Sequence, residues 1–218
     1  MSCPGPNGSD HSAPGRARQK SLTTARLMAT VWRMQNGDSS TNWVALLRGV
    51  NVGGVAVEMA ALRGLAEGLG WGEVKSYIAS GNLVFRAAGP AEGLRAALEA
   101  ALAGRYGRAI PVLILSGEGF RAALAAHPFQ PERGNQSHVF FCWDAPVLDQ
   151  ALFQALRAPD EDLRVTGGHV HFHAPGGIGR SKLAERLGKV VTGTEITGRN
   201  LNTVRKLAEM LDAGGQTG

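Results

Sequence analysis

The order of apolar and polar positions from residue 43 onward predicts short strands and helices in regular succession. The expected strands of the first part are residues 43–48, 74–78, 83–86 and 111–115, and the expected helices are residues 59–69 and 94–102. Ser80-Gly81-Asn82 separates the second and third strands as a hairpin turn. The order is therefore βαββαβ, the order of a split βαβ or ferredoxin-like unit.

A similar pattern follows in the second part of the chain. After a connecting helix near residues 120–125, the expected strands are residues 139–143, 163–166 and 169–173, with a weak final strand near residues 190–191. Helices are expected from Pro146, around Leu183 and Leu187, and from Leu201 to Leu211. Gly167-Gly168 reads as a second hairpin turn, and two hairpins require antiparallel strand pairs. We therefore expect an α+β protein with two ferredoxin-like (split βαβ, α/β-plait) halves and antiparallel sheets.

The expected organisation has five parts. These are an N-terminal tail (1–42), a ferredoxin-like half (43–116), a connecting helix and linker (117–136), a second α+β half (137–211) and a flexible C-terminus (212–218). The tail has little periodicity, so we expect it to be disordered, or to be an over-extended start upstream of Met28 or Met34. Its Arg-rich, Ser-rich and acid-poor composition also describes an organellar presequence.

Composition narrows the class of protein. With 44% hydrophobic and 19% charged residues over 218 positions, a globular protein is expected. No apolar run approaches the roughly 18–20 residues that a transmembrane helix requires, so we expect no membrane partner. The two cysteines, Cys3 and Cys142, lie far apart and form no CxxC pair, which excludes a disulfide framework and a cysteine zinc site. This cysteine usage favours a cytoplasmic location.

Positive charge is concentrated near the C-terminus. The chain carries a net charge of +5, and residues 176–206 alone hold seven Lys or Arg against two Glu, a balance of +5. Such a distribution favours an anionic partner, a small molecule or nucleic acid. A solvated basic face explains the same charge without any ligand.

Four motifs resemble a bacterial family of unknown function, the domain-of-unknown-function family 1697 (DUF1697). They are residues 43–54, 77–85, 179–183 and 197–207, in the order in which the family has them. The resemblance covers roughly residues 43–211. It implies an α+β plait and no activity, since the family has none established. One position departs from the family, which usually has an aromatic residue where this chain has Leu201; the departure weakens a stacking role there.

The first candidate site is the glycine-rich turn between the first strand and the first helix. Arg48, Asn51, Gly53 and Gly54 lie here, where backbone N–H groups at a helix start can hold a phosphate. The turn matches neither a Walker A loop nor a GxGxxG fingerprint. In the alternative reading, the glycines only provide positive φ and Arg48 pairs with a carboxylate. Ser80 and Asn82 of the second motif complete this part of the candidate ligand-binding set.

The closing motifs give the second candidate site. Arg180, Ser181 and Lys182 precede or enter a short helix, and Arg199 precedes the final helix, for which Asn200 or Asn202 is the expected N-cap, with Thr203 in the first turn. If the two helix N-termini converge, one anion could be shared between them. Removing Arg199 would then weaken anion binding more than it lowers stability. Ordinary capping with solvated cations is the alternative.

Other chemistry has little support in the sequence. His169, His171 and His173 alternate on one strand, but no acidic residue or cysteine accompanies them at metal-ligand spacing, so we expect no metal and an exposed sheet face. There is no GxSxG elbow or Cys–His signature, and Cys142 lies among aromatic residues as an expected core position. No cofactor is expected.

Three functions stay open at this point. The first is binding of a phosphate-bearing or other anionic ligand, including single-stranded nucleic acid, through the basic C-terminal motifs. The second is an enzyme acting on a small anionic metabolite in a cleft between the two halves. The third is a protein–protein interaction module in which the same polar residues are only helix caps.

Overall fold

The structure is a computed structural model that describes residue 1, residues 40–52 and residues 55–213. The chain divides into Met1–Ser39 and Ser40–Gly218, and the description below concerns the second unit. Our expectations for residues 2–39 and 214–218 lie outside the described residues, whereas Thr41 and Asn42, which we assigned to the tail, begin the first strand.

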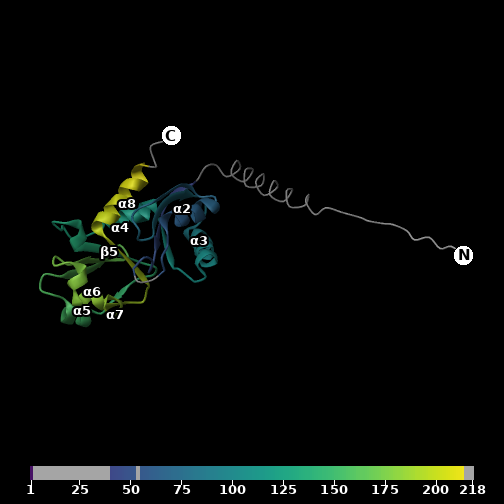
Figure 1. The fold of residues 1–218 in the computed structure, drawn as a ribbon. Coiled ribbons are helices and arrows are strands. Elements are labelled where there is room, and N and C mark those ends of the chain that lie inside the picture. The colour runs from purple at the N-terminus through teal and green to yellow at the C-terminus, as the bar shows by residue number, and fades with distance from the viewer. Residues whose placement is uncertain (2–39, 53–54, 214–218) are drawn as a thin grey trace. The chain divides into compact units, whose positions relative to one another are not determined.

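The first sheet has four antiparallel strands. They are β1 (Thr41–Leu47), β2 (Gly72–Ser76), β3 (Asn82–Ala87) and β4 (Val112–Ser116), in the order β2-β3-β1-β4. Helices α2 (Met59–Gly68) and α3 (Ala91–Tyr106) lie side by side and pack with this sheet (Figure 1). On β1, Trp43, Ala45 and Leu47 face that core, while Val44 and Leu46 face a second one. The strand is apolar throughout because both of its faces are buried.

The second sheet repeats this strand order. Its strands are β5 (Ser137–Cys142), β7 (Asp162–Thr166), β8 (His169–His173) and β10 (Ile196–Asn200), in the order β10-β5-β8-β7, and all pairs are antiparallel. Helices α5 (Gln150–Leu156), α6 (Lys182–Glu185) and α7 (Leu187–Val190) gather beside it (Figure 1). Phe153, Phe172 and Leu183 contribute to their common core. A two-stranded sheet pairs β6 (Val147–Leu148) with β9 (Val191–Thr192).

The remaining core belongs to both sheets. Helices α4 (Gly117–Ala125) and α8 (Leu201–Ala213) pack against each other, and α4 carries Phe120, which stacks on Phe141 of β5 at 5.2 Å between ring centroids. Val44 of β1 and Leu207 of α8 lie in the same buried cluster. The two sheets are therefore held together by one continuous apolar core as well as by the chain between them.

The fold class expected from the sequence is confirmed: the protein is α+β, with two four-stranded antiparallel sheets. Three expectations for the second part were wrong. The helix expected from Pro146 begins only at Gln150, with Asp149 as its N-cap, because Val147–Leu148 is strand β6. The helix expected around Leu183 and Leu187 is two short helices, α6 and α7.

The third error concerns the strand that closes the second sheet. We expected it near residues 190–191, but those residues lie at the junction of α7 and β9, and the closing strand is β10. Its sequence, ITGRN, lacks the apolar alternation by which strands are recognised. Thr197 and Arg199 are buried nevertheless, and Gly198 is required because a Cβ there would lie 2.6 Å from Cε1 of Phe140.

Candidate functional site

A cleft of about 580 Å³ lies where the first sheet meets β10. Four segments line it: the end of β1 with the turn that follows, Ser80 in the β2–β3 turn, residues 108–111 before β4, and residues 196–199 of β10. We call it the interhalf cleft. Its size is typical of small-molecule sites, and it brings together residues from three of the four motifs on which the family resemblance rests.

Arg199 lines this cleft and is buried, with only 7% of its surface exposed. Its guanidinium uses all five of its N–H donors within the protein. Nε donates to Oδ1 of Asn82. One terminal nitrogen donates to Oγ1 of Thr197 at 2.9 Å and to the Gly198 carbonyl at 2.8 Å. The other donates to the carbonyls of Leu47 at 2.8 Å and Ser80 at 3.0 Å.

The buried charge of Arg199 has no carboxylate beside it. No ion pair joins it to any residue within 40–52 or 55–213. Burial lowers its pKa to about 10, a value at which the group is still charged at neutral pH. A guanidinium satisfied only by neutral acceptors keeps its full positive charge in a poorly screened place, so it makes the electrostatic potential of the cleft positive.

The β2–β3 turn is held in an unusual conformation by this network. Asn82 is fully buried, and its amide nitrogen donates to the Tyr77 carbonyl at 2.9 Å and to Oγ of Ser80 at 2.8 Å. Ile78 has a φ of +47°, which is rare for a β-branched residue. Gly81 has a φ of +71°, and a Cβ there would lie 2.7 Å from Cβ of Leu47. Ser80 and Asn82 therefore shape the edge of the cleft through the backbone.

Arg48 spans the mouth of the cleft from β1 to the second sheet. Its Nε donates to the Ile196 carbonyl at 3.1 Å, and a terminal nitrogen lies 3.5 Å from a carboxylate oxygen of Glu195. Half of its side chain is exposed. It is therefore a partly engaged cation, which can exchange an exposed ion pair for a ligand at low cost because such pairs contribute little in water.

Asn51 organises the glycine-rich turn. Its amide nitrogen donates to the carbonyls of Val57 at 2.9 Å and Ala79 at 2.6 Å, and its Oδ1 accepts from the Val57 N–H at 2.8 Å. It therefore ties this turn to the β2–β3 turn and has its own polar atoms engaged. Gly53 and Gly54, which we also proposed as ligand-binding residues, lie outside the described residues.

Arg108 is a lining residue that sequence reasoning missed. It is exposed, lies just after the left-handed Gly107 that ends α3, and makes no hydrogen bond or ion pair with residues 40–52 or 55–213. The sequence carries little indication of a binding role for Arg108, because a lone arginine in a helix–strand connection is common. Only the folded chain shows that this guanidinium lies at the same cleft as Arg48 and Arg199.

The other predicted residues at the closing motifs lie elsewhere. Arg180, Ser181 and Lys182 do not line the cleft. Ser181 is the N-cap of α6, its Oγ accepting from the Ala184 N–H at 3.0 Å. Asn200 is the N-cap of α8, with its Oδ1 accepting from the Thr203 N–H at 2.9 Å, whereas Asn202 lies beside Gly134. Ser181 and Asn200 therefore have the capping role that we gave as the alternative.

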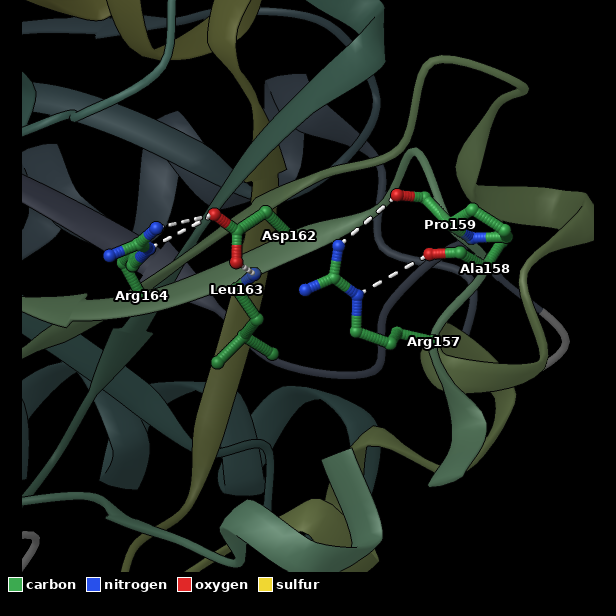
Figure 2. A network of polar contacts seen from close by, with 6 residues as sticks. All are labelled: Arg157, Ala158, Pro159, Asp162, Leu163 and Arg164. Carbon is green, nitrogen blue, oxygen red and sulfur yellow. Dashed lines mark hydrogen bonds and ion pairs between the residues drawn. The ribbon is translucent and has the colours of Figure 1, made fainter. Parts of the chain in front are cut away.

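Some arginines of the second sheet are committed to local contacts. Figure 2 shows two of them, Arg157 and Arg164, near the start of β7. Arg157 donates to the carbonyls of Ala158 and Pro159, and Arg164 donates twice to one carboxylate oxygen of Asp162, at 2.9 and 3.0 Å (Figure 2). The other oxygen of Asp162 accepts from the Leu163 N–H. Each of these two cations is therefore engaged by groups within two residues of it in the sequence.

Two of the three histidines of β8, His169 and His171, are buried and His173 is half-buried, contrary to our expectation of an exposed face. His171 is fully buried and His169 is 9% exposed. Nδ1 of His171 lies 3.0 Å from Nδ1 of His127, and its Nε2 lies 3.3 Å from the Thr166 carbonyl. The carbonyl can only accept, so Nε2 of neutral His171 carries the proton, and His127 donates through Nδ1. The segment that carries His127 and Phe129 covers this part of the sheet.

Burial governs the protonation of this cluster. It lowers the pKa of His127 to about 4, with further contributions from the charges of His171, Arg205 and His173, and it lowers the pKa of His138 to about 4. Nε2 of His127 and Nδ1 of His138 are buried without a partner among the described residues. Nowhere in residues 40–52 or 55–213 do three His, Cys, Asp or Glu side chains meet in a way that could hold a metal ion. At neutral pH, His127 and His138 are therefore uncharged.

The fold and the cleft define an α+β protein with paired antiparallel sheets and an electropositive cleft beside the closing strand. None of the helices in the described part of the chain is long and apolar enough to cross a membrane. A family profile described as a protein of unknown function, DUF1697, matches residues 40–171, so the chain belongs to this family.

One solved structure extends the comparison. The conserved bacterial protein SP0830 from Streptococcus pneumoniae superposes with a TM-score of 0.63 and 30% sequence identity, covering 80% of this chain and 99% of that protein. A comparison with curated proteins gives no match. The solved structure supports the fold, and neither the family description nor the description of that structure names an activity.

Proposed function

We propose that the interhalf cleft binds a small anionic molecule. Arg108 and Arg48 would contact the anion, and the buried charge of Arg199 would attract it without a direct hydrogen bond. The observation that carries this proposal is the charge balance at the cleft: Arg108 and Arg199 have no carboxylate partner among the described residues, and only Arg48 has one, Glu195. An anion in the cleft would offset this excess charge.

The shape of the site supports a small ligand over a nucleic acid. A single strand requires a basic groove with aromatic platforms on which successive bases stack. Among the described residues, those that line the cleft include no Phe, Tyr or Trp on which a base could stack. The positive groups are gathered at one cavity instead of following a track.

The site supports binding better than catalysis. The described residues that line the cleft include no His, Asp, Glu or Cys that could act as a general base or nucleophile. The hydroxyl of Ser80 accepts from Asn82, and that of Thr197 donates to the Leu47 carbonyl at 3.2 Å. We therefore propose that the protein binds the anion without transforming it. An enzymatic reaction in this cleft would need a ligand that supplies its own reactive groups.

Titration with inorganic phosphate and with sulfate tests this proposal. We expect both anions to raise the melting temperature of the wild type and to do so far less in Arg108→Gln. The matched control is Arg105→Gln, which removes the same charge three residues earlier, at a side chain outside the cleft. An equal response of Arg108→Gln and wild type would overturn the proposal. Tight binding of an oligonucleotide with a steep salt dependence would replace it with nucleic-acid binding.

The organisation of the chain also supports two lesser proposals. We infer that both halves are ferredoxin-like units divided near residues 117–136, because both four-stranded sheets have the same strand order. The second half follows the βαββαβ order of the first, apart from the added short strands β6 and β9 and the division of one helix into α6 and α7. We infer a cytoplasmic location, since Cys142 is an unpaired, buried thiol whose pKa burial raises to about 11.

A further inference from the structure

A second cavity of about 480 Å³ adjoins the interhalf cleft. The two cavities share Ala109, Ile110 and Pro111, the residues that follow Arg108. Beyond this shared wall, the second cavity is bounded by residues 95–103 of α3, by Trp143 after β5 and by Glu195. We call it the side pocket. A ligand that fills both cavities would pass over Ile110 and Pro111.

The side pocket differs from the cleft in its charge. Its three charged side chains all have partners: Glu99 accepts from the Val112 N–H at 2.9 Å, Glu195 pairs with Arg48 at 3.5 Å, and Arg95 pairs with Glu92 at 3.8 Å. The rest of its wall is apolar, formed by Ala100, Ala103, Ala109, Ile110, Pro111 and Trp143. An apolar group bound here would remove this apolar wall from water.

We propose that the ligand is an amphiphilic anion whose charged head lies beside Arg108 and whose alkyl or aryl body lies in the side pocket against Trp143. The inference rests on the proposed function, because the cleft must hold the head. It adds the class of ligand: a phosphate monoester or carboxylate with an apolar body. Such a molecule matches the two cavities. On one side of Ile110 and Pro111 lies positive charge without a carboxylate partner, and on the other side lies an apolar wall whose charged side chains have partners.

A series of alkyl phosphates tests the inference. We expect calorimetry to show that affinity rises about threefold to fourfold for each added methylene from ethyl to hexyl phosphate, until the pocket is filled. Hexyl phosphate should change the fluorescence of Trp143, inorganic phosphate should not, and Trp143→Phe should remove the signal. Ala103→Leu, which narrows the pocket, should abolish the chain-length dependence and keep the affinity for inorganic phosphate.

The controls separate this inference from the proposed function. Ala96→Leu adds the same side chain at an exposed position of α3 outside both cavities and should behave as wild type. Ala100→Leu, at an exposed position of the pocket wall, replaces Ala103→Leu if that variant does not fold. If phosphate bound but affinity did not rise with chain length, the amphiphilic ligand would be ruled out and the proposed function would stand. If hexanol bound as well as hexyl phosphate, the anionic head would be irrelevant and the proposed function would fail.

Discussion

Nε of Arg199 on β10 donates to Oδ1 of Asn82 at the start of β3, although 117 positions separate the two residues. The same guanidinium donates to carbonyls at the end of β1 and in the β2–β3 turn. One side chain of the second sheet therefore holds the end of β1 and the β2–β3 turn of the first sheet in place. The fold depends on this arginine for its geometry, while its charge, which pairs with no carboxylate of residues 40–52 or 55–213, makes the potential of the adjoining cleft more positive.

Replacing Arg199 should destabilise the protein severely. Arg199→Met would leave Asn82 and several buried carbonyls without donors, so we expect a loss of about 3 kcal/mol or more in the free energy of unfolding. This reverses the expectation from sequence that binding would suffer more than stability. Urea unfolding measures it, with Arg186→Met at an exposed position as the control. A loss below about 1 kcal/mol would show that water replaces the guanidinium readily.

Gly81 should tolerate no side chain. In Gly81→Ala the new Cβ would lie 2.7 Å from side-chain carbons of Leu47 and Val50, in addition to the strain of a φ of +71°. Gly168→Ala is the matched control, because its φ is +77° and nothing lies within 4 Å of its Cβ position. We expect the control to lose about 1–2 kcal/mol from backbone strain, and Gly81→Ala clearly more. Equal thermal shifts in the two variants would mean that the β2–β3 turn moves aside without resistance.

Stability should fall between pH 6.5 and 4. The folded-state pKa of His127 and of His138 is about 4, below the ordinary value of 6.5, so in this range the unfolded chain takes up protons that the folded chain does not. The contribution of these two histidines to the free energy of unfolding is therefore fully present above pH 6.5. It decreases as the pH falls and stops changing below pH 4. Urea midpoints at several pH values measure the decrease.

The variant His138→Gln separates the contribution of this histidine to the pH dependence of stability from that of the carboxylates, which the variant and the wild type share. Each group contributes up to about 1.4 kcal/mol per pH unit in this window, so the variant should show a shallower dependence. If the variant and the wild type had the same slope, His138 would be solvated in the native state and its depressed pKa would be refuted.

Removing residues 1–38 should leave the thermal midpoint nearly unchanged. The three hydrophobic cores of the described residues draw only on positions from Trp43 to Leu211, and β1 begins at Thr41. Differential scanning calorimetry of the shortened and full-length chains checks this. A decrease of more than a few degrees would assign a structural role to the N-terminal segment.

The sequence by itself determined the order of most elements and the antiparallel class. Apolar periodicity reports local burial, so it predicted a strand at residues 43–48, where β1 lies, the helix with Leu94, Leu98 and Leu102, and the final helix. Turn chemistry predicted both hairpins, and the side-chain oxygens of Ser and Asn indicated the caps of α6 and α8. These features depend on residues within a few positions of one another.

Tertiary structure alone decided the rest. Thr197 and Arg199 are polar, so nothing local marks ITGRN as a buried strand; its acceptors are supplied by Leu47, Ser80 and Asn82, more than a hundred positions away. The same holds for Arg108, which gains meaning only beside β10, and for His171, which is buried by the segment around His127. A polar side chain can be buried only when distant partners satisfy it, and a single sequence does not record which partners the fold brings.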